Sequence, residues 1–143
     1  ISYSFVFFMS KRKGSRVERE LFHMLWDEGH AVVRSAGSGS TSKPAPDLIT
    51  SDGDRVLAIE CKSIKGDKKY FDVHEIVQLN LFAKVFGAEP WVGVRFDNVG
   101  WFFVKSTDLK KSKGDSLLLS LEYMKKKGYQ FEELIGKYRQ KRL

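Results

Sequence analysis

Residues 44–62 read PAPDLITSDGDRVLAIECK. Two apolar runs, Leu48–Thr50 and Arg55–Lys62, flank the segment SDGD, and Asp-Gly between apolar runs is typical of a β-hairpin. The stretch therefore predicts two antiparallel strands. The second strand ends in Glu-Cys-Lys, and charged side chains next to an apolar run either mark the edge of the core or have a chemical role.

The alternation of side chains along a strand predicts which charges meet. Leu57, Ile59 and Cys61 point into the core, whereas Glu60 and Lys62 share the opposite face with Val56 and Ala58. If Asp52-Gly53 forms the turn, Asp47 lies opposite Ala58 and diagonal to Glu60, at a distance of about 7–8 Å between Cα atoms. Two carboxylates at that range can hold a hard divalent cation such as Mg²⁺, together with a carbonyl oxygen and waters.

These groups suit the hydrolysis of phosphodiesters. A divalent cation lowers the pKa of a bound water, polarises the phosphate and offsets charge on the leaving oxygen. Lys62 is placed to orient the attacking hydroxide and to meet the developing negative charge. The alternative is an exposed surface pair, with Asp47 as a turn residue. The combination of Pro-Asp, a glycine-containing hairpin, an apolar strand and Glu-x-Lys favours a metal-dependent nuclease.

Composition supports a nucleic-acid partner. The 143 residues carry a net charge of +7 and predict one domain with one core, and the excess of positive charge favours nucleic acid over acidic membrane as the polyanion. The single cysteine excludes an internal disulfide and favours a reducing, cytoplasmic setting. The first eight residues, ISYSFVFF, are too short to span a bilayer. We interpret residues 1–8 as an upstream extension of uncertain origin that packs as a strand, and residues 9–143 as a single domain.

The remaining pattern predicts an α/β fold with a mixed central sheet. One helix runs from Gly14-Ser15 to Gly29, and another runs from an Asp72 N-cap to Phe86, with Glu75 completing a capping box and Gly87 ending the helix. The expected further elements are strands at Ala31–Arg34, Trp91–Phe96, Trp101–Lys105 and Leu117–Leu119, a polar loop over residues 35–46, and helical turns through Lys127 and over Phe131–Arg142.

The motif formed by Pro46-Asp47 and Glu60-Cys61-Lys62 resembles that of the PD-(D/E)xK nuclease superfamily. Several other segments resemble the archaeal Holliday junction resolvases: KGSRVEREL at 13–21, VVRSAGS at 32–38, PDLI at 46–49, AIECK at 58–62, the helix carrying Gln78, Phe82 and Phe86-Gly87, and VGW at 99–101. The similarity covers most of residues 9–143.

The resemblance implies a restriction-endonuclease-like fold and a homodimeric, Mg²⁺-dependent endonuclease, with Mn²⁺ expected to substitute for Mg²⁺. Such an enzyme nicks two symmetric strands of a four-way DNA junction. The implied catalytic residues are Glu18, Arg34, Asp47, Glu60 and Lys62. The implied metal ligands are Asp47, Glu60, the backbone carbonyl of Cys61, and Glu18 through water.

Each of these residues has a structural alternative. Glu18 could close a capping box with Ser15, and Arg34 could pair with a carboxylate instead of a phosphate. The expected contacts to the DNA backbone come from Arg19, Arg34, Ser35, Ser38, Lys43 and Lys65, all of which could instead be solvated.

Phe82 and Phe86 are one helical turn apart, which predicts core packing, whereas the resemblance places them at a dimer interface. The Trp91/Trp101 strand pair is a second interface candidate. The three histidines have no ligand spacing, and no zinc site and no membrane partner are expected. Two competing functions remain open at this point. One is a restriction-type or repair endonuclease on the same fold, and the other is a DNA-binding module without catalysis.

Overall fold

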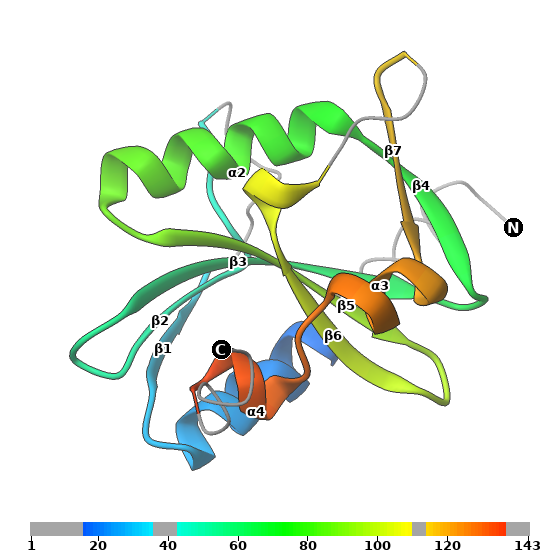
Figure 1. Cartoon of the computed structure of the whole chain (residues 1–143). Helices are drawn as coiled ribbons and strands as arrows, with labels where there is room; N and C mark the ends of the chain where they lie inside the picture. The colour runs from blue at the N-terminus through cyan, green and yellow to red at the C-terminus, as the bar shows by residue number, and fades with distance from the viewer. Residues whose placement is uncertain (1–15, 36–42, 110–113, 137–143) are drawn as a thin grey trace, which may run out of the picture.

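The computed structural model describes residues 16–35, 43–109 and 114–136 (Figure 1). The predicted upstream extension at residues 1–8 lies outside the described residues. The described chain begins with a helix over residues 16–27, here called the N-terminal helix. The elements that follow are β1 (Ala31–Arg34), β2 (Leu48–Ser51), β3 (Val56–Ile64), β4 (Lys68–Asp72), α2 (Val73–Phe86), β5 (Glu89–Phe96), β6 (Gly100–Lys105), the 3-10 turn η1 (Ser106–Asp108), β7 (Ser116–Ser120), α3 (Leu121–Lys127) and α4 (Phe131–Leu134).

The central sheet has five strands in the order β1-β2-β3-β5-β6. The pairs β1–β2, β2–β3 and β5–β6 are antiparallel, whereas β3 and β5 are parallel. A parallel pair needs a long crossover connection, and β4 with α2 provides it. The predicted mixed central sheet flanked by helices is confirmed.

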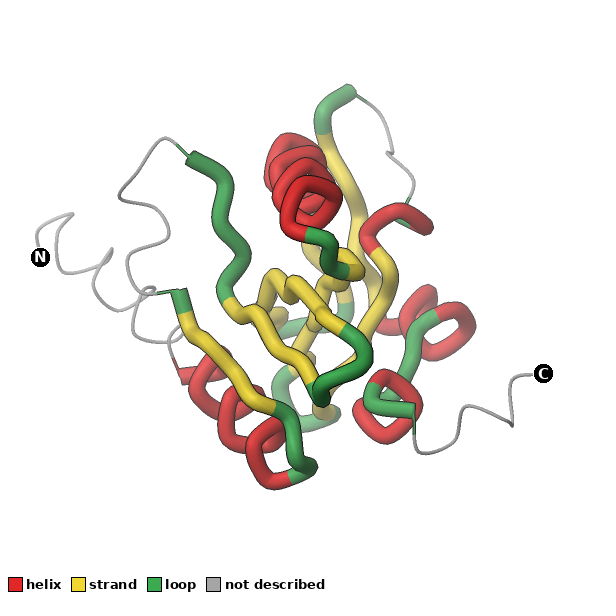
Figure 2. The backbone as a smooth tube through the Cα atoms, turned by 90° about the vertical axis from the view of Figure 1, so that its left-hand side faces the viewer, coloured by secondary structure: helices red, strands yellow, loops and turns green. Residues whose placement is uncertain are grey.

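Helices cover both faces of this sheet (Figures 1 and 2). On one face, Leu21 of the N-terminal helix and Leu134 of α4 pack with Leu57 and Ile59 of β3. On the other face, residues of α2 and α3 pack against Ala58, which is fully buried. The expectation that only the Leu57 face of β3 is core is therefore wrong. β3 is a central strand, and strands covered on both faces read as near-continuous apolar runs.

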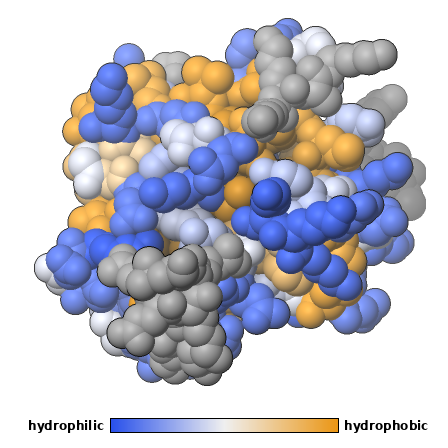
Figure 3. All heavy atoms as spheres, viewed as in Figure 1, coloured by the Kyte–Doolittle hydropathy of each residue, from blue (hydrophilic) through white to orange (hydrophobic). Residues whose placement is uncertain are grey.

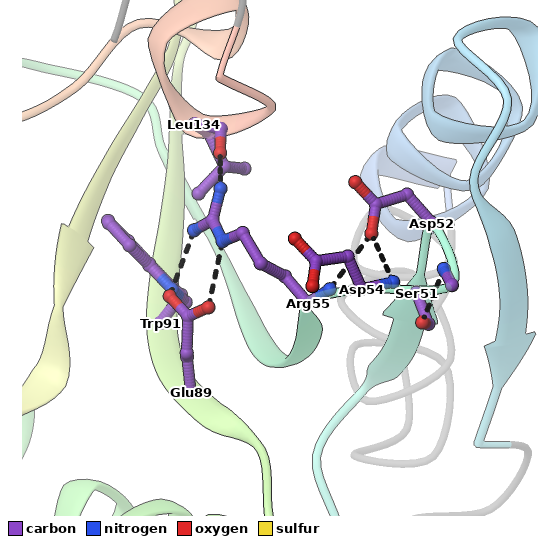
Figure 4. Close-up of polar contacts among 8 residues, drawn as sticks. Ser51, Asp52, Asp54, Arg55, Glu89, Trp91 and Leu134 are labelled. Carbon is purple, nitrogen blue, oxygen red and sulfur yellow. Dashed lines mark hydrogen bonds and ion pairs between the residues drawn. The ribbon is translucent and has the colours of Figure 1, made fainter.

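The turn of the β2–β3 hairpin is longer than predicted. Leu48 pairs with Ile59 and Ser51 pairs with Val56, so four residues form the turn. Asp52 organises this turn, because its Oδ1 accepts hydrogen bonds of 2.9 Å from the backbone N–H groups of both Asp54 and Arg55 (Figure 4). Extending the register by one position sets Asp47 opposite Glu60 and not opposite Ala58. The error is two residues, an even number, so the predicted faces are retained.

A second, two-stranded sheet joins β4 to β7. The predicted strand at Leu117–Leu119 is confirmed as part of β7. Its partner β4 was not predicted, because Lys68, Lys69 and Tyr70 are exposed and give the segment no apolar alternation.

The predicted Asp72 N-cap of α2 is confirmed, since Asp72 accepts a hydrogen bond of 2.9 Å from the backbone N–H of His74. Gly87, with a φ of 88°, ends α2 as predicted. The C-terminal helix is shorter than expected, because α4 ends at Leu134, before Gly136 at a φ of 90°. Residues 137–143 lie outside the described residues.

Trp91 and Trp101 are buried in the core, with 3% and 9% of their surface exposed. The Trp101 ring stacks on Phe103. The two tryptophan side chains therefore pack inside the single chain, and an interface at this strand pair remains a prediction. Within the part of the chain that the structure describes, no helix is long and apolar enough to cross a membrane.

Candidate active site

Asp47 is held immediately before β2 by two backbone contacts. Its carboxylate Oδ2 accepts a hydrogen bond of 2.8 Å from the backbone N–H of Cys61, and its carbonyl accepts one of 2.9 Å from Ser35. The side chain is buried, with 8% of the residue exposed. The Asp47 carboxyl lies in hydrogen-bonding contact with that of Glu60, so the predicted convergence of these two groups is observed.

Glu18 brings a third carboxyl to this position from the N-terminal helix. It contacts the Asp47 carboxyl, and its Oε2 accepts a hydrogen bond of 3.1 Å from Arg34 Nε. The Glu18 side chain therefore points toward the hairpin. Ser15, the partner in the alternative capping box, lies outside the described residues. For Arg34, the structure contains the ion pair that was the alternative to a phosphate contact.

The carboxyl groups hold protons far more tightly than free side chains do. Burial, and then the negative charge of Glu60, raise the pKa of Asp47 from 3.8 to about 8. Burial, and then the charge of Asp47, raise the pKa of Glu18 from 4.5 to about 7. Burial also raises the pKa of Glu60, although the positive charge of Lys62 opposes this shift. The carboxyl groups of Asp47 and Glu18 thus retain protons near neutral pH, and a bound cation would supply the positive charge that replaces these protons.

A divalent cation fits this donor set. The Oε1 atom of Glu60 is buried and has no hydrogen-bond partner, although buried carboxylate oxygens usually have one. Asp47 and Glu60 offer the oxygen ligands that Mg²⁺ prefers. Among the described residues, no three His, Cys, Asp or Glu side chains form a ready-made metal cluster. Backbone carbonyl, water and phosphate oxygens are therefore needed to complete the coordination.

Lys62 is held beside this group of acids. It is on the same face of β3 as Glu60, and its Nζ donates a hydrogen bond of 2.6 Å to Glu75 Oε1 in the first turn of α2. The ammonium also lies 5.1 Å from the centre of the Phe71 ring. Glu75 was predicted to complete a capping box, and its contact with Lys62 was not predicted, because hairpin spacing gives no information on where α2 packs.

Cys61 has the opposite orientation, as predicted, and packs against the core that contains Leu57 and Ile59. Burial raises the pKa of its thiol well above the usual value, which keeps the thiol neutral. Of the groups of Cys61, the thiol is therefore excluded as a metal ligand, and the backbone carbonyl remains a candidate.

The residues predicted to contact DNA are spread around the carboxyl group cluster. Arg19, Lys43 and Lys65 are exposed, and Ser35 is half-buried at the end of β1. Ser38 and the rest of 36–42 lie outside the described residues. His23 and His74 are exposed and His30 is buried, in keeping with the prediction of surface and packing roles.

The outer face of α2 carries an apolar surface. Phe82 and Phe86 stack with ring centres 5.3 Å apart, and 55% of Phe86 is exposed, so core packing is the wrong interpretation for Phe86. Leu81 and Val85 are exposed beside them. Together with Pro44, these four residues line a groove of about 390 Å³. In the space-filling view, apolar surface gathers over α2 (Figure 3).

Known proteins are similar to this chain in sequence and in fold. The family model described as archaeal Holliday junction resolvase (Hjc) matches residues 9–143. A crossover junction endodeoxyribonuclease Hjc from Archaeoglobus fulgidus is 36% identical over 92% of this chain and 96% of its own length. The Methanocaldococcus jannaschii protein of the same name is 35% identical over 90% of this chain and 91% of its own.

The fold comparison agrees with the sequence comparison. The solved structure of Archaeoglobus fulgidus Hjc, described as a Holliday junction resolvase, superposes with a TM-score of 0.78 at 32% identity, and the match covers 88% of this chain and 98% of that one. The chain belongs to the archaeal Holliday junction resolvase family.

Proposed function

We propose that this protein is a Mg²⁺-dependent endonuclease that hydrolyses phosphodiesters in four-way DNA junctions, with Mn²⁺ able to replace Mg²⁺. One observation carries the proposal. The buried carboxyls of Asp47 and Glu60 meet beside the Lys62 ammonium, within a fold of the resolvase family. The names of the Archaeoglobus fulgidus and Methanocaldococcus jannaschii relatives support the choice of junction DNA as the substrate.

Each side chain has a role in this proposal. Asp47, Glu60 and the Cys61 carbonyl hold the cation, and Glu18 reaches its shell through water. A bound divalent cation supplies an acidified water and offsets charge on the phosphate. Asp47 must release its proton before it can act as a ligand, because its pKa is about 8 without a cation. Lys62 meets the negative charge that develops on the phosphate.

Arg34 and the exposed cations place the DNA. The guanidinium of Arg34 is paired with Glu18 through Nε, and the planar fork of a guanidinium matches the geometry of a phosphate. Arg19, Ser35, Ser38, Lys43 and Lys65 extend the contact along the backbone. Each phosphate contact made by a lysine or arginine makes the binding more sensitive to salt.

A homodimer gives the activity its symmetry. Four-way junctions adopt two-fold symmetric forms, and a dimer with a two-fold axis presents two equivalent sites for paired nicks. The exposed Val85 and Phe86 on α2, with the half-buried Phe82, form an apolar surface suited to a second copy of the chain. Phe86→Asp should therefore shift the protein to monomers in analytical ultracentrifugation, whereas the exposed Lys84→Asp on the same helix should not. A dimeric Phe86→Asp protein would exclude this interface.

The cleavage assay compares a synthetic four-way junction with linear duplexes of the same arms, in the presence of Mg²⁺. We expect paired nicks in the junction, little cleavage of the duplexes, and a loss of at least about a thousandfold in Asp47→Ala and Glu60→Ala with junction binding retained. Equal cleavage of linear duplex would instead favour a restriction-type or repair enzyme. Normal cleavage by both alanine variants would exclude the proposed site.

A further inference from the structure

The Lys62 ammonium is fixed by contacts that come from outside its own hairpin. Glu75, from α2, accepts its hydrogen bond at 2.6 Å, and Phe71, from β4, presents a ring face at 5.1 Å. Only 15% of the Lys62 side chain is exposed. A lysine side chain has four rotatable carbon–carbon bonds, so these contacts restrict a group that is intrinsically mobile.

The position of Glu75 in α2 makes this contact informative. Glu75 is the third residue of the helix, where a glutamate commonly reaches back to the N-cap backbone. Here Asp72 caps the helix, and the Glu75 carboxylate extends to β3 instead. The carboxylate is thus directed to the lysine of the candidate active site.

We propose that Glu75 is a positioning residue that holds the Lys62 ammonium beside Glu60, where it meets the charge developing on the scissile phosphate. This inference rests on the proposed nuclease function. Glu75 accepts the hydrogen bond of the ammonium, and the charge of the same ammonium also acts on Glu60. Without Glu75 the ammonium would be drawn toward Glu60 and the proposed cation ligands. Misplacing a catalytic group by about 1 Å can reduce a rate about a hundredfold.

A purely stabilising role would give a different result. The Glu75 side chain is 41% exposed, so water screens its ion pair with Lys62 and limits what the pair contributes to folding. Loss of Glu75 should therefore affect the rate of cleavage much more than stability or DNA binding.

The test measures single-turnover cleavage of a four-way junction in Mg²⁺ at saturating enzyme. Glu75→Ala should cut at least about tenfold more slowly, with its junction affinity and thermal midpoint unchanged. Glu75→Gln should cut within about threefold of the wild-type rate, because its amide oxygen still accepts a hydrogen bond from the ammonium. Glu122→Ala is the control, since it removes another glutamate paired with a lysine, on the exposed surface of α3.

A double-mutant cycle shows whether Glu75 acts through Lys62. In a Lys62→Met background, Glu75→Ala should cause no further loss of the residual rate. A wild-type or faster rate in Glu75→Ala, or an equal loss in the Lys62→Met background, would overturn the positioning role. If Glu60→Ala and Lys62→Met cut normally, the proposed function itself fails. If both are defective while Glu75→Ala is normal, only the positioning role fails.

Discussion

The two ends of the β2–β3 hairpin, first the turn with Arg55 and then the open end with Asp47 and Glu60, carry charged groups in opposite conditions. At the first end, Arg55 Nε and Nη2 donate hydrogen bonds of 2.8 and 2.9 Å to the two carboxylate oxygens of Glu89 (Figure 4). Its Nη1 donates another of 2.8 Å to the carbonyl of Leu134, at the end of α4. Hydrogen bonds from Arg55 lower the pKa of Glu89 and those to Glu89 raise the pKa of Arg55, so both groups are more stably charged than usual.

At the other end, the shifts are reversed. Asp47, Glu18 and Glu60 all have raised pKa values, and burial is the largest cause for each of them. Arg34 lowers the pKa of Glu18 and Lys62 lowers that of Glu60, but neither outweighs the effect of burial.

This difference distinguishes charged groups that stabilise the fold from charged groups that form the candidate site. Arg55 joins β3 to β5 and α4, and it is balanced by groups of the chain itself. A cluster of buried acids that disfavours folding persists where a ligand supplies the missing charge, and perturbed pKa values gather at functional sites for this reason. The chain balances its charges at the turn, where they stabilise the fold, and leaves them unbalanced where we propose that it binds a cation.

The largest stability effect is expected from breaking the balanced end. Arg55→Ala leaves the Glu89 carboxylate partly buried without its bidentate partner and removes a hydrogen bond from Leu134. We expect the free energy of unfolding to fall by about 3 kcal/mol in urea denaturation, because the variant loses three hydrogen bonds that the charged guanidinium donates. Arg95→Ala, which breaks the more exposed pair with Glu20, should cost less. Equal losses in the two variants would show that Arg55 is not special.

A smaller effect of opposite sign is expected at the unbalanced end. Because the pKa of Asp47 is about 8 when folded and 3.8 otherwise, the folded state retains a proton that the unfolded chain has lost. Its contribution to stability therefore falls as the pH rises from about 4 to about 8. Asp47→Asn, without divalent cations, should gain about 1.4 kcal/mol or more at pH 8 and almost nothing at pH 4.

Urea denaturation at both pH values measures this gain. Asp54→Asn is the matched control, since Asp54 is exposed in the hairpin turn. A gain for Asp47→Asn that does not change with pH would mean that Asp47 is not protonated in the folded protein.

Local sequence signals predicted much of the fold and of the candidate site. The strands around Asp-Gly, the Asp72 N-cap and the Gly87 stop depend on neighbouring residues, and all are observed. The predicted convergence of Asp47 and Glu60 is observed although the turn is longer than expected. The register differs by two residues, and an even difference leaves each side chain on the predicted face of its strand. That error arose because Asp52 accepts two backbone hydrogen bonds and lengthens the turn to four residues.

The features that sequence reasoning missed depend on packing between distant segments. β4 has no apolar alternation and is a strand only because β7 pairs with it. Glu75 meets Lys62 because α2 packs against β3, a relation that no local spacing encodes. The burial of Trp91 and Trp101 was not predicted, because the exposure of an aromatic side chain depends on which helices cover the sheet.

Calorimetric titration of Mg²⁺ into the protein measures whether the acids at the open end of the hairpin hold a cation. The wild type and Glu89→Gln, altered only at the balanced end, should bind Mg²⁺ with similar affinity and release protons on binding. Glu60→Gln should bind at least about tenfold more weakly, since it replaces a ligand at the unbalanced end. If Glu60→Gln binds Mg²⁺ as tightly as the wild type, the acids at the open end of the hairpin do not hold the cation, and the proposed metal site is wrong.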